Sequence, residues 1–526
     1  MHRHLIRRIP GVATLALVTT VAAGGVVGLV HGQSGPGLRF EVTLDPSLPA
    51  QPAGRLLVVI VSRASGVSSE RLEPRRLIGR TGRNAALTIG VDTLPLAAGG
   101  IVTLDASAAA FPIESLAEIP PGEYDVQAVL ATNRDLNLPD APGNLFSAPA
   151  RIRLGPGRTE IVTGRLTLSE TVPVEQPPAD EEYLRFVTIR SDRLTAFHGR
   201  PIDLRAGVIL PRGFDQEPDR RYPVRVHIGG YGSRSTSVRS MMRPGSSFRE
   251  AWLADTAPRM LLLHLDGAGP YGDPYQVNSA NNGPYGDAVT QELIPHVERE
   301  FRGVGEPRAR VLDGGSTGGW VSLALQIFYP DFFNGAWASC PDGVDFRGFQ
   351  LVDIYGDDSA YVNEQGTELP SARNRDGTVR FTVRHEVQME NVLGLGDSWT
   401  MSGRQWGAWN ATYGPRGEDG RPVPLWDPKT GVIDRSVTRR WEQYDLRLVL
   451  ERGWDELAPK LQGKLNIWVG EMDDYYLNNA VHLLDEFLRS RPSGLDARIE
   501  YGPDRGHCWT GISQAEMLRE MGRRVN

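Results

Sequence analysis

Cysteine is scarce in this sequence of 526 residues, which has only Cys340 and Cys508. Two cysteines exclude the dense disulfide framework that stabilises small extracellular scaffolds. Long runs of lysine and arginine are also missing, and the formal net charge is -7. Because binding to phosphate requires clustered cations, these features argue against nucleic acid as a partner. The share of hydrophobic residues, 40%, is sufficient for folding around buried cores.

The N-terminal segment has the composition of an export signal. Basic residues within 2–8 precede an uncharged stretch at 12–30, and residues of small or modest size stand at 30–32. This pattern predicts a signal peptide at 1–32 and a secreted or periplasmic protein. The uncharged stretch is also long enough to cross a bilayer, so the alternative is an extracytoplasmic protein that stays anchored to the membrane.

A chain of this length is expected to form two or three domains. Residues 37–170 contain short alternating runs such as Leu38–Leu44, separated by turn-forming residues, and no long run with a helical period. We predict a β-sandwich-like domain at 37–170, followed by a stiff linker at 171–182 that is rich in proline and acidic residues. A structural or docking role is expected for this domain, and binding of a carbohydrate or polymer is the alternative.

From residue 183 onward, strand-like apolar runs alternate with helical patterns. Nearly all-apolar runs, as at 260–266, are typical of central strands in a parallel sheet. Apolar residues at intervals of four between 289 and 301 indicate a helix. The alternation predicts an α/β domain at 183–526, built on a doubly wound, mostly parallel sheet with helices on both sides.

The segment GGSTG at 314–318 has the G-x-S-x-G pattern of a nucleophile elbow. In such an elbow, glycines allow a turn from strand to helix that is too tight for side chains, and the serine hydroxyl stands exposed above the sheet. The context agrees, because an apolar strand with Val311 and Leu312 precedes the segment and a helical pattern ended by Pro330 follows it. We therefore predict that Ser316 is the nucleophile.

A serine hydroxyl requires a base at neutral pH, and hydrolases with this elbow have the order serine, acid, histidine along the chain. Asp473 follows a strand by one tight turn, where the acid that orients the histidine is expected. Asp474 and Glu471 are the alternatives, since acidic residues cluster at this turn. His507 lies in a loop after the next strand and is the predicted general base.

The oxyanion that forms during ester hydrolysis needs two backbone donors. The N–H of Thr317, directly after the nucleophile, is expected to be one of them. The other is expected from the glycine-rich loop at 227–232, where we favour Tyr231 over Gly230. A plain glycine turn is the alternative interpretation of this loop.

An insert at 343–460 interrupts the alternation of strands and helices, and it contains six of the chain's eleven tryptophans. Because long irregular segments inside compact domains usually have a function, we expect it to pack as a lid over the carboxyl ends of the strands. A decoration on the far edge of the sheet is the alternative. Most of the tryptophans should pack the insert itself. The candidates for lining a substrate cleft are Trp399, Trp406, Trp409 and, next to the histidine loop, Trp509.

The motifs together resemble the putative esterase family of α/β-hydrolases, which includes esterase D, feruloyl esterases, enterochelin esterases and mycolyltransferases. The matching segments are HIGGYG at 227–232, YGDAVTQELIP at 285–295, GGSTGG at 314–319 with YPDFF at 329–333, GEMDD at 470–474 and GHCW at 506–509. The resemblance covers most of 183–340 and 460–526, but not clearly the insert or the β region. It implies hydrolysis of an ester or thioester without a metal or other cofactor, and it leaves the acyl and alcohol groups open.

The two cysteines are expected to meet beside the nucleophile. Cys340 ends the strand after the nucleophile helix and Cys508 directly follows His507, so both reach the carboxyl edge of the sheet. Oxidising conditions outside the cytoplasm favour a bond between them. Some feruloyl esterases and tannases are similar in bonding a cysteine after the catalytic histidine to one just before the serine, a position that Gly315 occupies here. Two separate buried thiols are the alternative.

The predicted function is hydrolysis of a small-molecule or polymer-linked ester through an acyl-enzyme. An acyltransferase with the same triad is one alternative, and only dependence on an acceptor alcohol would separate the two. A serine peptidase of the prolyl-oligopeptidase type is another, although residues 37–170 are too short for the repeats of its propeller. The intact serine, acid and histidine argue against a binding protein without catalytic activity. The oligomeric state stays open.

Overall fold

The computed structural model describes residues 37–65, 73–174, 176, 178–492 and 494–525. The predicted signal peptide at 1–32 lies outside the described residues. Among the helices that are described, none is both long enough and apolar enough to cross a membrane.

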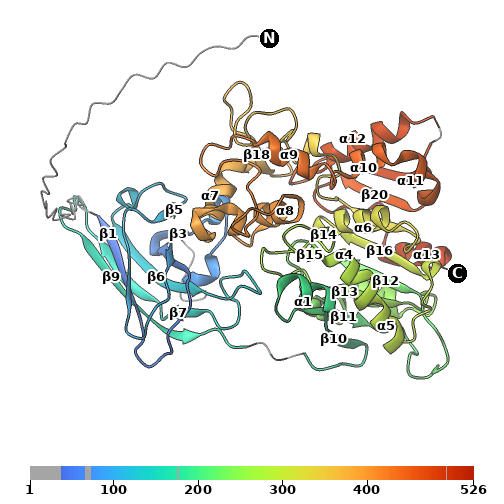
Figure 1. Cartoon of the computed structure of the whole chain (residues 1–526), viewed down its shortest axis with the longest axis horizontal. Coiled ribbons are helices and arrows are strands. Elements are labelled where there is room, and N and C mark those ends of the chain that lie inside the picture. The colour runs from blue at the N-terminus through green and yellow to red at the C-terminus, as the bar shows by residue number, and fades with distance from the viewer. Residues whose placement is uncertain (1–36, 66–72, 175, 177, 493, 526) are drawn as a thin grey trace, which may run out of the picture. The chain divides into compact units, whose positions relative to one another are not determined.

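The N-terminal β region forms a nine-stranded sheet with the order β4-β1-β9-β7-β6-β2-β3-β5, and β8 pairs with β6 (Figure 1). β1 pairs with β9 in parallel and with β4 in antiparallel fashion. The strands are β1 (Leu38–Leu44), β2 (Gly54–Ser62), β3 (Leu87–Thr93), β4 (Ile101–Leu104), β5 (Ala109–Phe111), β6 (Gly122–Ala131), β7 (Leu145–Ser147), β8 (Ala150–Leu154) and β9 (Val162–Thr171).

Strand β2 is buried on both faces, because its residues alternate between two cores. Leu56, Val58 and Ile60 join the core of the β region. Leu57 and Val59 face the opposite way and pack in a second cluster with Met389, Val392 and Leu393 of α7 (Val383–Leu393). The N-terminal β region and the insert therefore share a hydrophobic core, which the sequence did not indicate.

The second region contains an eight-stranded sheet with the order β10-β11-β13-β12-β16-β17-β20-β21. The pairs β10–β11 and β11–β13 are antiparallel, and the remaining pairs are parallel. The predicted mixed α/β architecture is confirmed. The strands are β10 (Leu184–Arg190), β11 (Asp203–Ile209), β12 (Val224–Ile228), β13 (Leu261–Leu265), β16 (Arg310–Gly315), β17 (Ala336–Ser339), β20 (Leu465–Gly470) and β21 (Ala497–Gly502).

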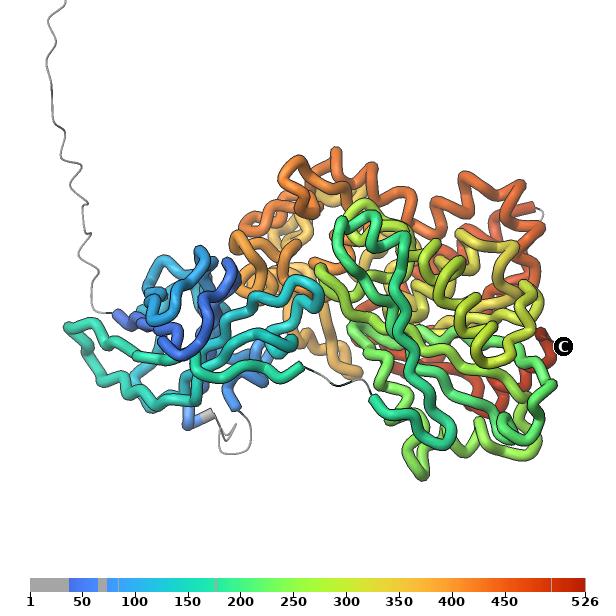
Figure 2. The backbone as a smooth tube through the Cα atoms, turned by 60° about the horizontal axis from the view of Figure 1, so that its bottom comes forward, coloured from blue at the N-terminus to red at the C-terminus, as the bar shows by residue number. Residues whose placement is uncertain are grey.

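Helices pack on both faces of this sheet (Figures 1 and 2). On one face, Val226 and Leu312 of the central strands join a large core that continues into the insert. On the other face, Leu262 and Val311 pack against α3 and α13. The helices outside the insert are α1 (Asp192–His198), α2 (Val238–Met241), α3 (Ser247–Leu253), α4 (Tyr285–Ala288), α5 (Ile294–Glu300), α6 (Thr317–Phe328), α12 (Asn478–Arg489) and α13 (Gln514–Val525). A π-helical segment, Val289–Leu293, joins α4 to α5.

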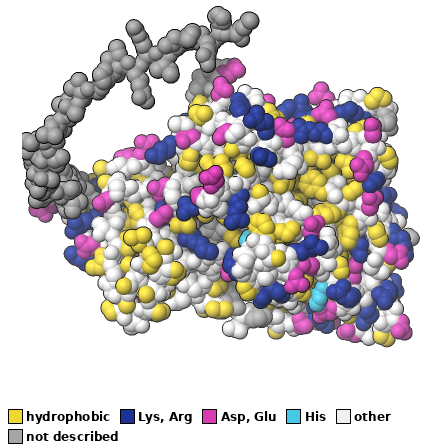
Figure 3. All heavy atoms as spheres, in the orientation of Figure 1, with side chains coloured by type: hydrophobic (Ala, Val, Ile, Leu, Met, Phe, Trp, Pro, Cys, Tyr) yellow, Lys and Arg dark blue, Asp and Glu magenta, His cyan; other side chains and the backbone are white. Residues whose placement is uncertain are grey.

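The insert is built around an aromatic core. Trp399 stacks on Trp426 at 4.7 Å between ring centroids, and Trp406 meets both Trp409 and Trp426 edge-on. Besides α7, its elements are β18 (Pro370–Arg373), β19 (Val379–Thr382), α8 (Gln405–Tyr413), α9 (Arg435–Trp441), α10 (Leu446–Arg452) and α11 (Trp454–Leu461). Two further short strands, β14 (Asn278–Ser279) and β15 (Gly283–Pro284), pair with each other before α4. On the face shown in Figure 3, acidic and basic side chains are interspersed.

Candidate active site

Ser316 stands at a tight turn between β16 and α6, with φ 57° and ψ -123°. A non-glycine residue rarely adopts a positive φ, and such strain is characteristic of functional turns. The neighbouring glycines leave no room for side chains. A Cβ on Gly318 would lie 2.0 Å from the carbonyl oxygen of Ile228, and one on Gly314 would lie 2.4 Å from the backbone of Gly318. The GGSTG segment thus has the geometry of a nucleophile elbow.

His507 and Asp473 are joined by a hydrogen bond of 2.9 Å between Nδ1 and Oδ2. Asp473 is fully buried, and its other oxygen accepts the backbone N–H of Tyr475 at 2.9 Å. Of the two alternatives, Asp474 accepts the backbone N–H of His507 rather than the ring, and Glu471 pairs with His482. The structure therefore brings Asp473, and neither alternative, to the imidazole.

The electrostatic surroundings favour a protonated imidazole. Burial by itself lowers the pKa of His507, but the hydrogen bond that the ring donates to Asp473 and the negative charges of Asp473, Asp342 and Asp474 outweigh this effect, so the pKa is raised. The ring of Tyr475 packs edge-on against the imidazole, with 5.0 Å between centroids. The neighbouring carboxylates thus favour the charged, imidazolium form of His507.

The hydroxyl of Ser316 donates a hydrogen bond to Oδ1 of Asp342 at 3.2 Å. Among the described residues, no hydrogen bond joins Ser316 to His507, whose Nε2 lies 4.0 Å from Sγ of Cys340. Catalytic hydrogen bonds are often loose in unliganded enzymes and tighten when substrate binds.

Asp342 is the residue of this site that the sequence analysis missed. It is 1% exposed, and its second oxygen accepts hydrogen bonds from the Tyr275 hydroxyl (2.8 Å), the Thr317 hydroxyl (3.1 Å), the Trp409 indole (3.2 Å) and the Gln405 amide (3.3 Å). Burial raises the pKa of Asp342, and the hydrogen bonds from Tyr275 and Thr317 oppose that rise. One feature of the sequence indicates this residue. It is an acid just after β17, at the carboxyl edge where ligands bind in parallel sheets.

Of the four tryptophans proposed for a substrate cleft, Trp409 reaches this cluster through its bond to Asp342. The others pack elsewhere within the described residues. Trp399 stacks inside the insert core, and the Trp406 indole donates to Glu386 at 2.9 Å. Trp509 packs with the cluster of α3 and α13 on the opposite face of the sheet. The partners of these three side chains come from other parts of the chain, so the periodicity of the sequence could not identify them.

The loop after β12 lies beside the elbow, as the close approach of Ile228 to Gly318 shows. Within the described residues, no protein acceptor pairs with the N–H of Gly230 or Tyr231. Thr317 is the first residue of α6, so its N–H is also unused by the helix. The Tyr231 hydroxyl donates to the carbonyl of Gly403 at 3.0 Å, which ties this loop to the insert. The backbone donors proposed for an oxyanion are thus unoccupied by protein groups.

Cys340 and Cys508 form a disulfide, with 4.8 Å between their Cα atoms. The bond ties the loop of His507 to the strand next to the elbow. A Cβ on Gly315 would lie 3.2 Å from the sulfur of Cys508, so a cysteine before the nucleophile would approach the same partner. The two sulfurs and the imidazole lie within 4.8 Å of one another. Because both sulfurs are in the disulfide, neither is available as a thiolate ligand for a metal.

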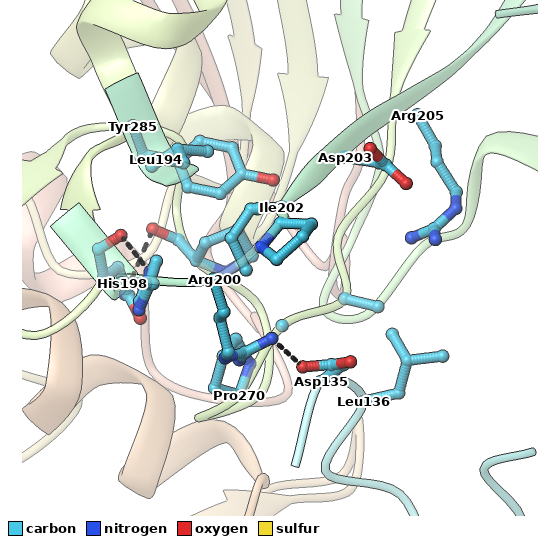
Figure 4. Close-up of a pocket in the computed structure, with 15 residues that line it drawn as sticks. Asp135, Leu136, Leu194, His198, Arg200, Ile202, Asp203, Arg205, Pro270 and Tyr285 are labelled. Carbon is cyan, nitrogen blue, oxygen red and sulfur yellow. Dashed lines mark hydrogen bonds and ion pairs between the residues drawn. The ribbon is translucent and has the colours of Figure 1, made fainter. Parts of the chain in front are cut away.

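A separate pocket lies between the β region and the sheet of the catalytic region (Figure 4). Arg200 forms an ion pair with Asp135 in its lining, and His198 lies 3.3 Å from the carbonyl of Asn282. The lining residues include Tyr285 but not Ser316, Asp473 or His507. This pocket is therefore distinct from the cluster around the elbow.

Residues 201–445 match the putative esterase family. The match contains the elbow, extends through most of the insert, which the motifs did not clearly cover, and ends before Asp473. No curated protein matches the sequence. Similar solved structures include a ferulic acid esterase (13% identity, TM-score 0.40, 65% of this chain and 98% of that chain). A second is an S-formylglutathione hydrolase from Agrobacterium tumefaciens (13% identity, TM-score 0.36, 65% of this chain and 95% of that chain). A third is a ferulic acid esterase from Anaeromyces mucronatus in complex with ferulic acid (14% identity, TM-score 0.32, 67% of this chain and 95% of that chain). The family match over 201–445 confirms the resemblance that the motifs predicted, and it is consistent with an esterase-like α/β-hydrolase.

Proposed function

We propose that the protein is a serine esterase in which Ser316 is the nucleophile, His507 the general base and Asp473 the acid that orients the imidazole. The observation that carries this proposal is the 2.9 Å bond between His507 and Asp473 beside a strained elbow. The family match over 201–445 supports the reaction class, since it includes the elbow.

In the proposed reaction, the Ser316 hydroxyl turns from Asp342 to Nε2 of His507. Its oxygen bonds to the ester carbonyl carbon while His507 takes the proton. The N–H groups of Thr317 and Tyr231, with Gly230 as the alternative, stabilise the oxyanion. The bond to the alcohol then breaks and His507 protonates the leaving oxygen. Water adds to the acyl-enzyme in the same way, which releases the carboxylic acid and restores the serine hydroxyl.

The remaining parts of the chain have supporting roles in this proposal. The disulfide holds the His507 loop in position, and the insert at 343–460 covers the carboxyl edge of a doubly wound sheet in the catalytic domain, 183–526. The linker at 171–182 separates that domain from a β-sandwich-like module at 37–170. Export through the N-terminal segment would place the enzyme in the oxidising compartment that the disulfide requires.

Labelling with a fluorophosphonate probe tests the proposal, together with hydrolysis of p-nitrophenyl acetate. The wild type should be labelled and active, and Ser316→Ala should lose the label and about a million-fold in kcat, as in other triad enzymes. The matched control is Ser322→Ala in the same helix, whose hydroxyl bonds only to the carbonyl of Gly318 among the described residues. Retention of a tenth of the activity by Ser316→Ala would refute the assignment. Formation of a new ester with added alcohols, in preference to acid, would identify an acyltransferase.

A further inference from the structure

Asp342 is a buried carboxylate that the triad does not use. It contacts the nucleophile directly, through the 3.2 Å bond from Ser316. Two other buried acids are neutralised by arginine, Asp313 by Arg225 and Glu298 by Arg310. The buried Asp273 and Glu390, like Asp342, are held by neutral hydrogen-bond donors. Among the described residues, no lysine or arginine forms an ion pair or hydrogen bond with Asp342. Since a buried carboxylate without a cationic partner is costly, its retention beside the nucleophile calls for a functional explanation.

The two oxygens of Asp342 differ in their hydrogen bonding. Oδ2 accepts from the four side chains described above, so its capacity is filled. Within the described residues, Oδ1 has a single donor, the hydroxyl of Ser316. When Ser316 turns to donate to His507, Oδ1 loses that donor and becomes an unpaired oxygen in a buried position. A substrate group that donates a hydrogen bond at this point would remove the resulting free-energy cost.

We propose, on the basis of the esterase function above, that Asp342 recognises the acyl group of the substrate, and that the preferred acyl group carries a hydrogen-bond donor on the carbon next to the ester carbonyl. An ammonium is the best donor, because it also supplies the positive charge that the carboxylate lacks. A hydroxyl is the second-best donor. A hydrogen or a methyl on the same carbon cannot donate and leaves Oδ1 unpaired.

Distance limits the donor to this position. Before it turns to His507, the Ser316 Oγ that will bond to the carbonyl carbon lies 3.2 Å from Oδ1. A substituent on the adjacent carbon is separated from the carbonyl carbon by two bonds of about 1.5 Å each. It therefore lies within hydrogen-bonding reach of Oδ1. The side chains of Gln405 and Trp409 bond to Oδ2, so Oδ1 is the oxygen of Asp342 that is left for a substrate donor.

A series of four methyl esters that differ in one substituent tests this inference with the wild-type protein. The esters are methyl alaninate, methyl lactate, methyl propionate and methyl isobutyrate, which place an ammonium, a hydroxyl, a hydrogen and a methyl on the same carbon. At about pH 6.5 an α-ammonium is protonated. Because an α-ammonium or α-hydroxyl also activates an ester chemically, each kcat/KM is divided by the rate constant for hydroxide-catalysed hydrolysis of the same ester. We expect this normalised kcat/KM to decrease in the order given, with methyl alaninate about tenfold or more above methyl propionate. An equal or higher normalised value for methyl propionate would overturn the inference.

Asp342→Asn tests the residue itself, because the amide keeps the shape and an acceptor oxygen but removes the charge. The ratio of kcat/KM for methyl alaninate to kcat/KM for methyl lactate should fall about tenfold in this variant. The reason is that the charge-assisted bond between the carboxylate and the ammonium becomes a bond to a neutral amide. Asp445→Asn is the matched control, since Asp445 is also fully buried but bonds to Phe346 and Tyr355 away from the elbow. Its substrate ratio should equal that of the wild type.

Two measurements keep the failures distinct. A wild-type protein that takes no fluorophosphonate label and hydrolyses none of the esters would refute the esterase function. A protein that is labelled at Ser316 but shows no preference for a donor-bearing acyl group would refute only the role of Asp342. An unchanged ratio in a labelled Asp342→Asn variant would do the same. If that variant does not fold, the ester series with the wild-type protein still tests whether a donor-bearing acyl group is preferred.

Discussion

The acid opposite His507 is selected by its burial and by the direction of its side chain. Three acids share the turn after β20, yet only Asp473 bonds to the imidazole among the described residues. Its second oxygen is held by the backbone of the same turn, at the N–H groups of Tyr475 and Leu477. The carboxylate is therefore held in place by the backbone. In the proposed mechanism, it keeps the proton on Nδ1 and leaves Nε2 free to act as a base.

Asp473→Asn should consequently lower kcat by about ten-thousandfold, because an amide at this position stabilises the wrong tautomer of the imidazole. Asp474→Asn and Glu471→Gln serve as controls and should retain most of the activity. Steady-state kinetics with p-nitrophenyl acetate provide the measurement. A loss in Asp474→Asn as large as that in Asp473→Asn would contradict the assignment.

The pH dependence of hydrolysis follows from the raised pKa of His507. The general base must be neutral, so kcat/KM should decrease as pH falls through this pKa, which lies above its ordinary value of about 6.5. Asp473, Asp342 and Asp474 contribute the negative charge that raises it. In Asp342→Asn, removal of one of these charges should move the acidic limb of the pH profile to lower pH. An identical limb in wild type and variant would show that Asp342 carries no charge near the imidazole, and Asp445→Asn is the control.

At the scale of elements, the disulfide joins the end of β17 to the loop that carries His507. This loop has no regular secondary structure between β21 and α13, so a covalent bond is an effective way to hold it. The double variant Cys340→Ala/Cys508→Ala should lose about tenfold to a hundredfold in kcat, because displacement of a catalytic group by about 1 Å has effects of this size.

A reducing dithiol separates positioning from other effects of these substitutions. It should lower the activity of the wild-type protein and leave the double variant unchanged. Unaltered kcat after complete reduction, with both thiols titrated, would show that the loop holds its position without the bond.

At the scale of the whole molecule, the N-terminal β region and the insert are packed together. Arg55 of β2 is 2% exposed and donates to the carbonyl of Val392 at 2.9 Å, while it pairs with Asp92 at 2.8 Å and Asp397 at 2.7 Å. The insert also carries Gln405 and Trp409, which bond to Asp342. The β region is thus connected, through the insert, to the surroundings of the nucleophile.

Arg55→Ala should lower the free energy of unfolding by about 2 kcal/mol, because it removes charge-assisted hydrogen bonds from a buried contact. Arg76→Ala is the control, since Arg76 is 46% exposed and lies 3.0 Å from Asp140, itself 52% exposed, in a surface ion pair. Such pairs contribute about 1 kcal/mol at most. Thermal unfolding provides the measurement, and equal midpoints for the two variants would contradict a stabilising role of the shared core.

The sequence by itself was sufficient for features that depend on neighbouring residues or on strand ends. The elbow could be predicted because its glycines, its strand and its helix lie within about twenty residues of one another. Asp473, His507 and the cysteines could be placed at one edge, because the carboxyl ends of parallel strands meet there. The mixed α/β fold followed from the alternation of apolar runs and helical patterns.

Only the tertiary structure decided which distant side chains surround the nucleophile. Asp342, Tyr275, Gln405 and Trp409 are brought together by contacts across as many as 130 positions of the chain, and none of them belongs to a local motif. The same holds for Arg55, which contacts a carbonyl 337 positions away. Such contacts depend on how the insert packs on the sheet and on the β region. Periodicity reports which face of an element is buried, but not which partner covers that face.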